Sequence, residues 1–127
     1  MKPIYVIQEH HAEKAGLHYD LRLQVNDVLF SWVIKKDPII DIGTTRLAIR
    51  QPDHALSWAT FKGRIKEGYG KGLVKIYDKG HYMPLKLSKG KMLFEIHGKK
   101  LKGIYSLSKG KDDKNWFFKK EGELDDI

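Results

Sequence analysis

Short runs of alternating polar and apolar residues, separated by turn-forming residues, follow one another along most of this chain. Regular spacing of such runs is typical of an all-β sandwich or barrel. Only two segments, Ala12–Ala15 and Ala55–Phe61, could form short helices, and neither is long enough to show helical periodicity. The sequence predicts a small closed or nearly closed β-barrel of about eight strands, with a polar groove and at most one or two short helices. The expected strands are Ile4–Gln8, His18–Val25, Val28–Ile34, Arg46–Arg50, Leu73–Tyr77, His81–Leu85, Met92–Ile96, Gly103–Ser108 and Asn115–Lys119.

Turns are expected at two sequence signals. Asn26-Asp27 lies between two alternating runs and suits a two-residue hairpin turn. Asp78-Lys79-Gly80 is expected to separate the strands on either side of it.

Length and composition favour one domain over residues 1–127, with enough apolar residues for a core. The chain has no cysteine, which excludes disulfides, cysteine-ligated zinc and a thiol nucleophile. No apolar run reaches the roughly 18 residues of a membrane span, and the first residues lack the apolar region of a signal peptide. We therefore expect a soluble, cytoplasmic protein without a membrane partner.

The positive charge is concentrated in one part of the chain. Lys and Arg number 24 against 16 Asp and Glu, a net charge of +8. Residues 86–120 contain eleven lysines and three acids, and this difference of eight accounts for the whole excess. A polyanion such as DNA or RNA is the expected partner, and a lysine-rich solvated surface is the alternative.

One expected strand contains the main candidate functional side chains. Alternation from residue 18 to residue 23 places His18, Asp20 and Arg22 on one face, each about 6.6 Å from the next, and leaves the apolar residues between them for the core. Imidazole and carboxylate suit a divalent metal, and a guanidinium suits a phosphate oxygen beside it. The alternative is an Asp20–Arg22 ion pair with His18 partly exposed.

Other segments offer further polar groups. Gln8-Glu9-His10-His11 adds a second imidazole from a neighbouring strand. Arg46 and Arg50 are expected on one strand face with Ala48, which leaves Leu47 and Ile49 for the core. His54 follows a turn-like segment and is expected on a loop. His81 and His97 are expected at the surface, and residues 67–72 are glycine-rich but lack a P-loop pattern.

The segments Gln8–Ala12 and Gly16–Leu23 resemble the 3′-phosphoesterase family, best known as the end-processing domain of bacterial ligase D and also found as free-standing archaeal proteins. The resemblance covers nearly the whole chain in the expected order. It continues through Ser31-Trp32, Lys36, Arg46-Leu47-Ala48, Asp53-His54, Phe61-Lys62-Gly63, Glu67-Gly68, Tyr69-Gly70, Gly72, Asp78-Lys79-Gly80 and Trp116-Phe117-Phe118-Lys119.

The resemblance implies a compact β-barrel with a crescent-shaped groove, dependence on manganese (Mn²⁺), and action on DNA or RNA 3′ ends such as those of a primer-template. It implies removal of a terminal 3′ ribonucleoside as a phosphodiesterase, followed by removal of the 3′-phosphate as a phosphomonoesterase. A separate ligase and polymerase would then act in trans.

Site residues follow from the same resemblance. The implied metal ligands are His10, His18 and Asp20; the groups around the phosphate are Arg22, Arg46 and His54; and the supporting positions are Gln8, Lys36 and Trp58.

Three departures from the family pattern leave alternatives open. Extra residues within Glu13–Gly16 leave His11 as an alternative ligand to His10. Trp58 stands where the family usually has a tyrosine, and an indole lacks the hydroxyl. Strict alternation puts Lys35 rather than Lys36 on the metal face, and a bulge could reconcile the two.

Two other functions are compatible with the residues. A non-catalytic basic nucleic-acid-binding barrel needs only a basic groove and stacking aromatics. A phosphoesterase of small metabolites needs the metal site but not the lysines.

Overall fold

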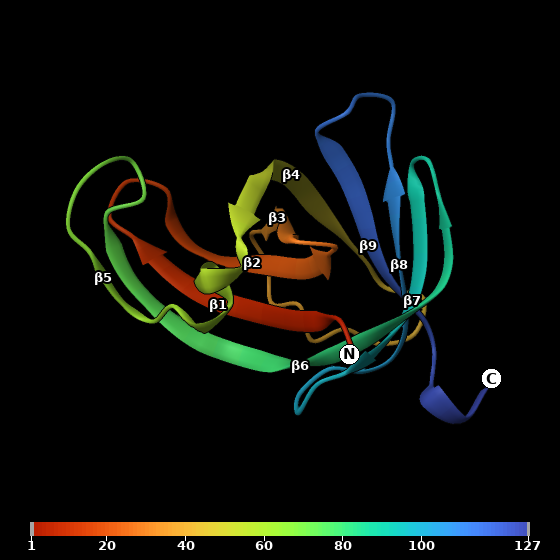
Figure 1. Ribbon diagram of the computed structural model, residues 1–127. Helices are drawn as coiled ribbons and strands as arrows, with labels where there is room; N and C mark the ends of the chain where they lie inside the picture. The colour runs from red at the N-terminus through yellow and green to blue at the C-terminus, as the bar shows by residue number, and fades with distance from the viewer. Residues whose placement is uncertain (1, 127) are drawn as a thin grey trace.

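The computed structural model describes residues 2–126, whose regular structure is almost entirely β-strand (Figure 1). Two 3₁₀ helices, η1 (Leu56–Thr60) and η2 (Leu124–Asp126), are the only helical turns in this part of the chain. The strands are β1 (Ile4–Ala12), β2 (Gly16–Val25), β3 (Val28–Ile34), β4 (Thr45–Ala55), β5 (Gly63–Ile65), β6 (Gly72–Ser88), β7 (Lys91–His97), β8 (Lys102–Lys109) and β9 (Asn115–Gly122).

Eight of these strands form a closed antiparallel ring. The order is β1-β2-β3-β4-β9-β8-β7-β6, and pairing of β1 with β6 closes it, while β5 extends the edge of β6. The prediction of an all-β, closed or nearly closed structure of about eight strands is confirmed. Among the described residues, no helix is long and apolar enough to cross a membrane.

The β2–β3 hairpin agrees closely with the sequence prediction. Val25 pairs with Val28, and Asn26 adopts a positive φ of 54°, as a tight two-residue turn requires. Tyr19, Leu21 and Leu23 are buried in the main core, as alternation predicts. This core fills the ring, where the Tyr105 and Phe118 rings stack 5.1 Å apart.

A smaller apolar cluster covers the opposite side of β1. Val6 and Leu29 pack there under η1, together with Ala59 and Trp58. As a result β1 has buried residues on both faces, and two of its polar side chains, Gln8 and His10, are buried on the side that η1 covers.

The expected turn at Asp78-Lys79-Gly80 is wrong, because residues 72–88 form one strand, β6. Asp78 is buried and accepts hydrogen bonds from the Tyr5 hydroxyl (2.9 Å) and from the backbone N–H groups of Lys99 (2.9 Å), Lys100 (3.0 Å) and Leu101 (2.9 Å). Its carboxylate therefore ties down the β7–β8 turn. Gly80 allows close approach of the next strand, since a Cβ there would collide with the His97 carbonyl.

Three local expectations also need correction. Residues 12–15 form the end of β1 and the turn into β2 rather than a helix, whereas Ala55–Phe61 does contain the 3₁₀ helix η1. His54 lies within β4, not on a loop. In the same strand Ala48 is fully buried and Leu47 is 48% exposed, the reverse of the expectation, because Ala48 pairs with Trp116 over the filled core and Leu47 pairs with Phe117 on the outside.

Candidate metal and phosphate site

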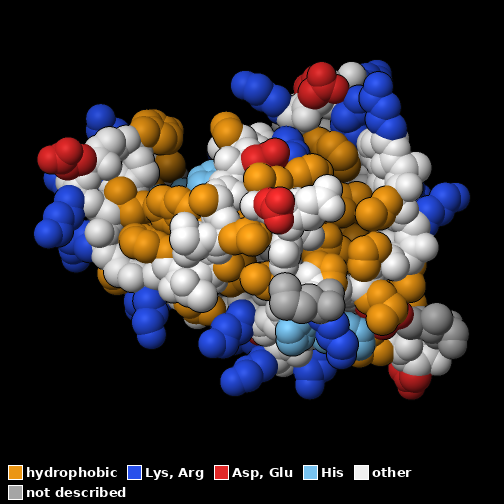
Figure 2. Space-filling view, viewed as in Figure 1, with side chains coloured by type: hydrophobic (Ala, Val, Ile, Leu, Met, Phe, Trp, Pro, Cys, Tyr) orange, Lys and Arg blue, Asp and Glu red, His pale blue; other side chains and the backbone are white. Residues whose placement is uncertain are grey.

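A cavity of about 620 Å³ opens between β1–β4 and the loop that joins β5 to β6. Figure 2 shows the hollow left of centre, with histidine atoms visible inside it. The residues that line it are Gln8, His10, Ala12, Ala15, His18, Asp20, Arg22, Val33, Lys35, Ile49, Gln51, His54, Trp58, Ile65, Tyr69, Gly70 and Val74.

Strand register brings two imidazoles and a carboxylate together. His10 of β1 pairs directly with His18 of β2, and Asp20 is next on the same face of β2. Asp20 Oδ2 lies 3.5 Å from His10 Nδ1 and 3.6 Å from His18 Nε2. One ligand atom from each residue lies within 4.8 Å of the others, and all three residues are buried.

Backbone carbonyls orient both imidazoles. His10 Nε2 donates to the Gly70 carbonyl (2.7 Å) and His18 Nδ1 donates to the Gly16 carbonyl (3.3 Å). The other ring nitrogens, His10 Nδ1 and His18 Nε2, therefore face Asp20, and this second bond on each ring is typical of metal-ligating histidines. The donor set fits a divalent metal ion.

The charges of this cluster stabilise one another. Burial raises the pKa of Asp20, but hydrogen bonds from His10 and His18 and the charge of Arg22 outweigh it, so that the pKa lies well below its usual range. The hydrogen bond to Asp20 raises the pKa of His10 against the opposing effect of burial. Asp20 is thus ionised and able to bind a cation.

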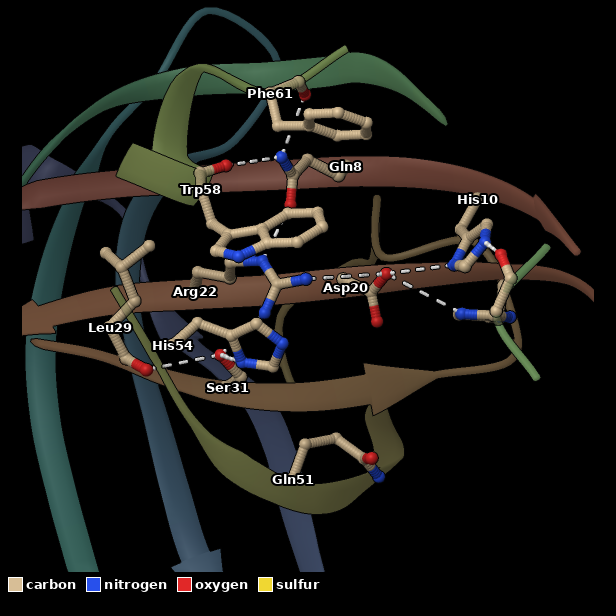
Figure 3. Close-up of polar contacts among 12 residues, drawn as sticks. Gln8, His10, Asp20, Arg22, Leu29, Ser31, Gln51, His54, Trp58 and Phe61 are labelled. Atoms are coloured by element: carbon tan, nitrogen blue, oxygen red, sulfur yellow. Dashed lines mark hydrogen bonds and ion pairs between the residues drawn. The ribbon is translucent and has the colours of Figure 1, made fainter. Parts of the chain in front are cut away.

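Arg22 is held rigidly beside the cluster (Figure 3). Its Nε donates to Gln8 Oε1 (2.6 Å), its Nη1 donates to Ser31 Oγ (2.8 Å), and its Nη2 lies 3.9 Å from Asp20 Oδ2. Gln8 in turn donates to the carbonyls of Trp58 (2.7 Å) and Phe61 (3.0 Å). A buried, preorganised guanidinium next to a metal site is suited to a phosphate oxygen.

His54 reaches the same cavity from β4. Its Nδ1 donates to the Pro52 carbonyl (2.9 Å), which leaves Nε2 with a free lone pair in the neutral ring. Its ring meets the Trp58 ring edge-on at 5.7 Å. Burial lowers the pKa of His54 and the charge of Arg22 lowers it further, so the neutral form is favoured.

The structure brings together most of the predicted site residues. Seven of them line the cavity: Gln8, His10, His18, Asp20, Arg22, His54 and Trp58. His11 points to the other face and bonds Glu9 (2.7 Å), so His10 is the imidazole that joins His18 and Asp20. The Asp20–Arg22 contact exists, but His18 is buried rather than partly exposed.

Two predicted residues do not line this cavity. Arg46 Nε donates to the Asp37 carbonyl (3.0 Å). Lys35 and Lys36 both follow the end of β3 and are exposed, and of the two only Lys35 lines the cavity. The alternation of β3 thus continues through Lys35, with no bulge at this end of the strand.

Sequence reasoning gave no role to Ser31, Gln51, Tyr69 or Gly70. Ser31 could have been found by counting the hairpin register, because it pairs with Arg22 across the predicted turn. Gln51 pairs with Ser31 one strand further on. Gly70 and Tyr69 come from a loop distant in sequence, and the family resemblance, which includes Tyr69-Gly70, assigned no role to either residue.

Comparisons with known proteins agree with this geometry. A family profile described as the DNA Ligase D 3′-phosphoesterase domain matches residues 8–109. The chain is 39% identical over 131 residues to the multifunctional non-homologous end joining protein LigD of Pseudomonas aeruginosa, covering 94% of this chain and 15% of that protein. It is 39% identical over 115 residues to the multifunctional non-homologous end joining DNA repair protein LigD of Mycobacterium tuberculosis, covering 87% of this chain and 15% of that protein.

The chain thus spans about 15% of the length of these curated relatives. The matched residues include the whole histidine–aspartate–arginine cluster and the strands that carry it. The chain belongs to the DNA ligase D 3′-phosphoesterase domain family.

Proposed function

We propose that this protein is a manganese-dependent phosphoesterase that processes nucleic-acid 3′ ends. It removes a terminal 3′ ribonucleoside as a phosphodiesterase and then removes the remaining 3′-phosphate as a phosphomonoesterase, leaving a 3′-hydroxyl. The observation that supports this most directly is that His10, His18 and Asp20 share one cavity with the buried cation of Arg22. A non-catalytic binding barrel would not need this arrangement.

In this proposal His10, His18 and Asp20 hold the divalent ion, through His10 Nδ1, His18 Nε2 and an Asp20 carboxylate oxygen. When bound, such an ion supplies Lewis-acid polarisation of a phosphate oxygen. The two imidazoles and the carboxylate match the ligand preference of manganese among other first-row metals.

Arg22 neutralises charge on the phosphate oxygens, because preorganised donors usually supply the largest stabilisation of a transition state. Gln8 and Ser31 hold its guanidinium in place. His54 is proposed to contact the phosphate or to donate a proton to the leaving oxygen through Nε2, once the negative charge of the bound phosphate has favoured protonation of its ring. Arg46 and Lys36 match the family pattern, and any role at the phosphate would require them to act from outside the cavity.

Trp58 is expected to affect the second step, removal of the 3′-phosphate. Its ring packs 4.7 Å from Phe61 and 5.9 Å from the Arg22 guanidinium, where an indole cannot offer a hydroxyl to a phosphate. We therefore propose that the phosphomonoesterase step is the slower of the two. The nucleic-acid partner would be a primer-template 3′ end, with a separate ligase and polymerase acting in trans.

The test is incubation of the full chain with Mn²⁺ and a primer-template that ends in one ribonucleotide. A product shortened by one nucleoside and carrying a 3′-phosphate, later converted to a 3′-hydroxyl, is the expected result. The Asp20→Asn variant should lose this activity, and the exposed Asp41→Asn variant should retain it. Binding without cleavage would favour the non-catalytic barrel, and cleavage of small phosphate esters only would favour a metabolite phosphoesterase.

A further inference from the structure

The cavity has two chemically different sides. The metal and phosphate groups occupy one side, and the other is apolar and continuous with them. Val74 pairs with His10 in the β1–β6 ladder, so the apolar side begins next to a proposed metal ligand. The residues of this apolar side are Ala12, Ala15, Ile65, Tyr69 and Val74.

Tyr69 stands at the rim of this apolar side. It is 73% exposed, more than any other large hydrophobic residue described, and it lines both the main cavity and a smaller neighbouring pocket. An exposed aromatic ring beside an apolar wall offers a flat face that nothing else in the described chain covers. Single exposed aromatic residues are common, so exposure alone does not identify a binding site. The position of Tyr69 beside the cavity and the contacts that hold its loop are the relevant evidence.

The loop that carries Tyr69 is fixed to the metal site. Gly70, the next residue, accepts the His10 Nε2 hydrogen bond (2.7 Å), and a Cβ on Gly70 would lie 3.4 Å from His10 Cε1. Gly68 has a φ of +90°, and its carbonyl accepts from the Lys71 N–H (3.2 Å). The Lys71 carbonyl accepts from the Glu13 N–H (2.8 Å), which joins this loop to the β1–β2 turn (Figure 1).

The cavity is larger than a phosphate alone requires. At about 620 Å³ it lies within the usual range of sites for small organic ligands. The pocket on the other side of Tyr69 is lined by Lys14, Lys66 and Lys71, together with Glu13 and Glu67. A ligand with a phosphate and a flat ring system complements the two sides of the cavity. The neighbouring pocket has a net charge of +1, with Lys71 paired to Glu13 (3.8 Å), and is compatible with a flanking anionic backbone. A nucleotide at a strand end has these parts.

We propose that the apolar side of the cavity is a nucleobase subsite and that Tyr69 stacks on the 3′-terminal base. This inference rests on the proposed function and adds to it a residue that positions the substrate. Stacking on an aromatic side chain is tolerant of base identity, so the subsite accepts any of the four bases. Because Gly70 is bonded to His10, base stacking sets the distance of the terminal phosphate from the metal ligands.

The kinetic test compares two primer-templates, one with an ordinary 3′-terminal ribonucleotide and one with an abasic 3′-terminal ribose. Tyr69→Ala should raise KM for the ordinary substrate about tenfold, in the range measured for loss of one stacked base. It should have little further effect on the abasic substrate, whose KM is already raised in the wild-type protein. Tyr69→Phe should behave as wild type, since it keeps the ring.

Phe117→Ala is the matched control, because Phe117 is an aromatic residue of β9 that is 44% exposed and does not line the cavity. Equal KM values for the two substrates in the wild-type protein would overturn the subsite. So would a Tyr69→Phe variant as impaired as Tyr69→Ala, because the hydroxyl rather than the ring would then be responsible.

A second measurement separates this inference from the proposed function. An oligonucleotide with 2-aminopurine as its 3′-terminal base is titrated with the full chain in EDTA, where no turnover occurs. Quenching in the wild type that is lost in Tyr69→Ala supports the subsite even if no cleavage is found. Equal quenching in both proteins overturns it even if the phosphoesterase activity is confirmed.

Discussion

Adjacent histidines of β1 lie on opposite faces of the sheet. His10 is buried beside His18 and Asp20 as a candidate metal ligand, whereas the side chain of His11 is 43% exposed and bonded to Glu9. Replacing either residue removes one imidazole, but only His10 lines the cavity. A variant of His11 is therefore the control for a variant of His10.

We predict that Mn²⁺ raises the Tm of the wild-type protein and of His11→Ala but not of His10→Ala. A ligand that binds only the folded state stabilises it by RT ln(1 + [L]/Kd), about 2.7 kcal/mol at a hundredfold excess over Kd. Thermal denaturation with and without the metal measures this. A metal-induced rise in Tm that survives in His10→Ala would exclude this residue as a ligand.

His54 makes the metal-free protein sensitive to acid. Burial lowers its pKa in the folded state, while the unfolded chain titrates near the ordinary value of about 6.5. The unfolded state therefore binds the proton first, and stability falls as the pH drops through and below about 6.5. We predict that His54→Gln loses less stability than wild type between pH 7 and pH 5, measured by urea denaturation in EDTA. An identical loss in both proteins would assign the acid sensitivity to other groups.

At the scale of elements, one buried carboxylate of β6 holds the β7–β8 turn against the sheet. Asp78 accepts four hydrogen bonds, three of them from the β7–β8 turn and one from Tyr5. Burial raises the pKa of the Tyr5 hydroxyl and the nearby Asp78 charge raises it further, so Tyr5 remains a donor throughout the stable pH range.

We predict that Asp78→Ala lowers the free energy of unfolding by about 3 kcal/mol, because buried donors lose their only acceptor. Asp78→Asn should lie between this variant and wild type, since its amide oxygen can still accept but carries no charge. Urea denaturation gives both values, with the exposed Asp41→Ala as control. A cost below about 0.5 kcal/mol for Asp78→Ala would mean that water replaces these contacts.

The alternation of polar and apolar residues predicted the β2–β3 hairpin and the polar side chains on one face of β2, because both depend on residues that are neighbours in the sequence. Val28–Ile34 has the predicted bounds, and the polar face of β2 follows from residues 18–22 alone. The three backbone N–H groups that bond Asp78 lie 21 to 23 residues further along the chain, and Tyr5 lies 73 residues before it. No neighbouring residue therefore distinguished Asp78-Lys79-Gly80 from a turn. Likewise, which of Leu47 and Ala48 faces the core is known only from the pairing of β4 with β9, a strand distant in the sequence, where Ala48 lies opposite Trp116.

At the scale of the whole molecule, the charge and the cavity lie in different parts. No residue between 86 and 120 lines the cavity, although this segment carries the whole net positive charge. Of its three hairpin turns, β6–β7 and β8–β9 lie side by side, because the Lys109 N–H at the start of the β8–β9 turn donates to the Gly90 carbonyl (2.7 Å). In Figure 1 both turns are at the top, on the same side of the molecule as the β1–β2 and β5–β6 loops beside the cavity. Under the proposed function, a nucleic acid bound in the cavity would extend toward these lysines.

We predict that replacing Lys89, Lys111 and Lys114 with Ala weakens binding to a primer-template and flattens its salt dependence. Each lost phosphate contact lowers the slope of log K against log salt by about 0.9. A salt titration by fluorescence anisotropy measures this. The triple variant of Lys62, Lys75 and Lys79 removes the same charge from exposed positions that surround a different pocket. If both triple variants weakened binding equally, the lysines would act through the overall positive charge of the protein rather than through direct contacts with the nucleic acid.

The 17 residues of β6 pair with β5 and β1 near the cavity and with β7 in the lysine-rich segment. The wall beside the metal ligands and the hairpin that carries Lys86–Lys91 are consequently parts of one continuous backbone ladder. A peptide bond cut in the middle of this strand would leave both fragments with a bare sheet edge and an opened core. The cavity wall and the lysine-rich hairpin thus share one strand, and we expect the two to lose their structure together when the chain unfolds.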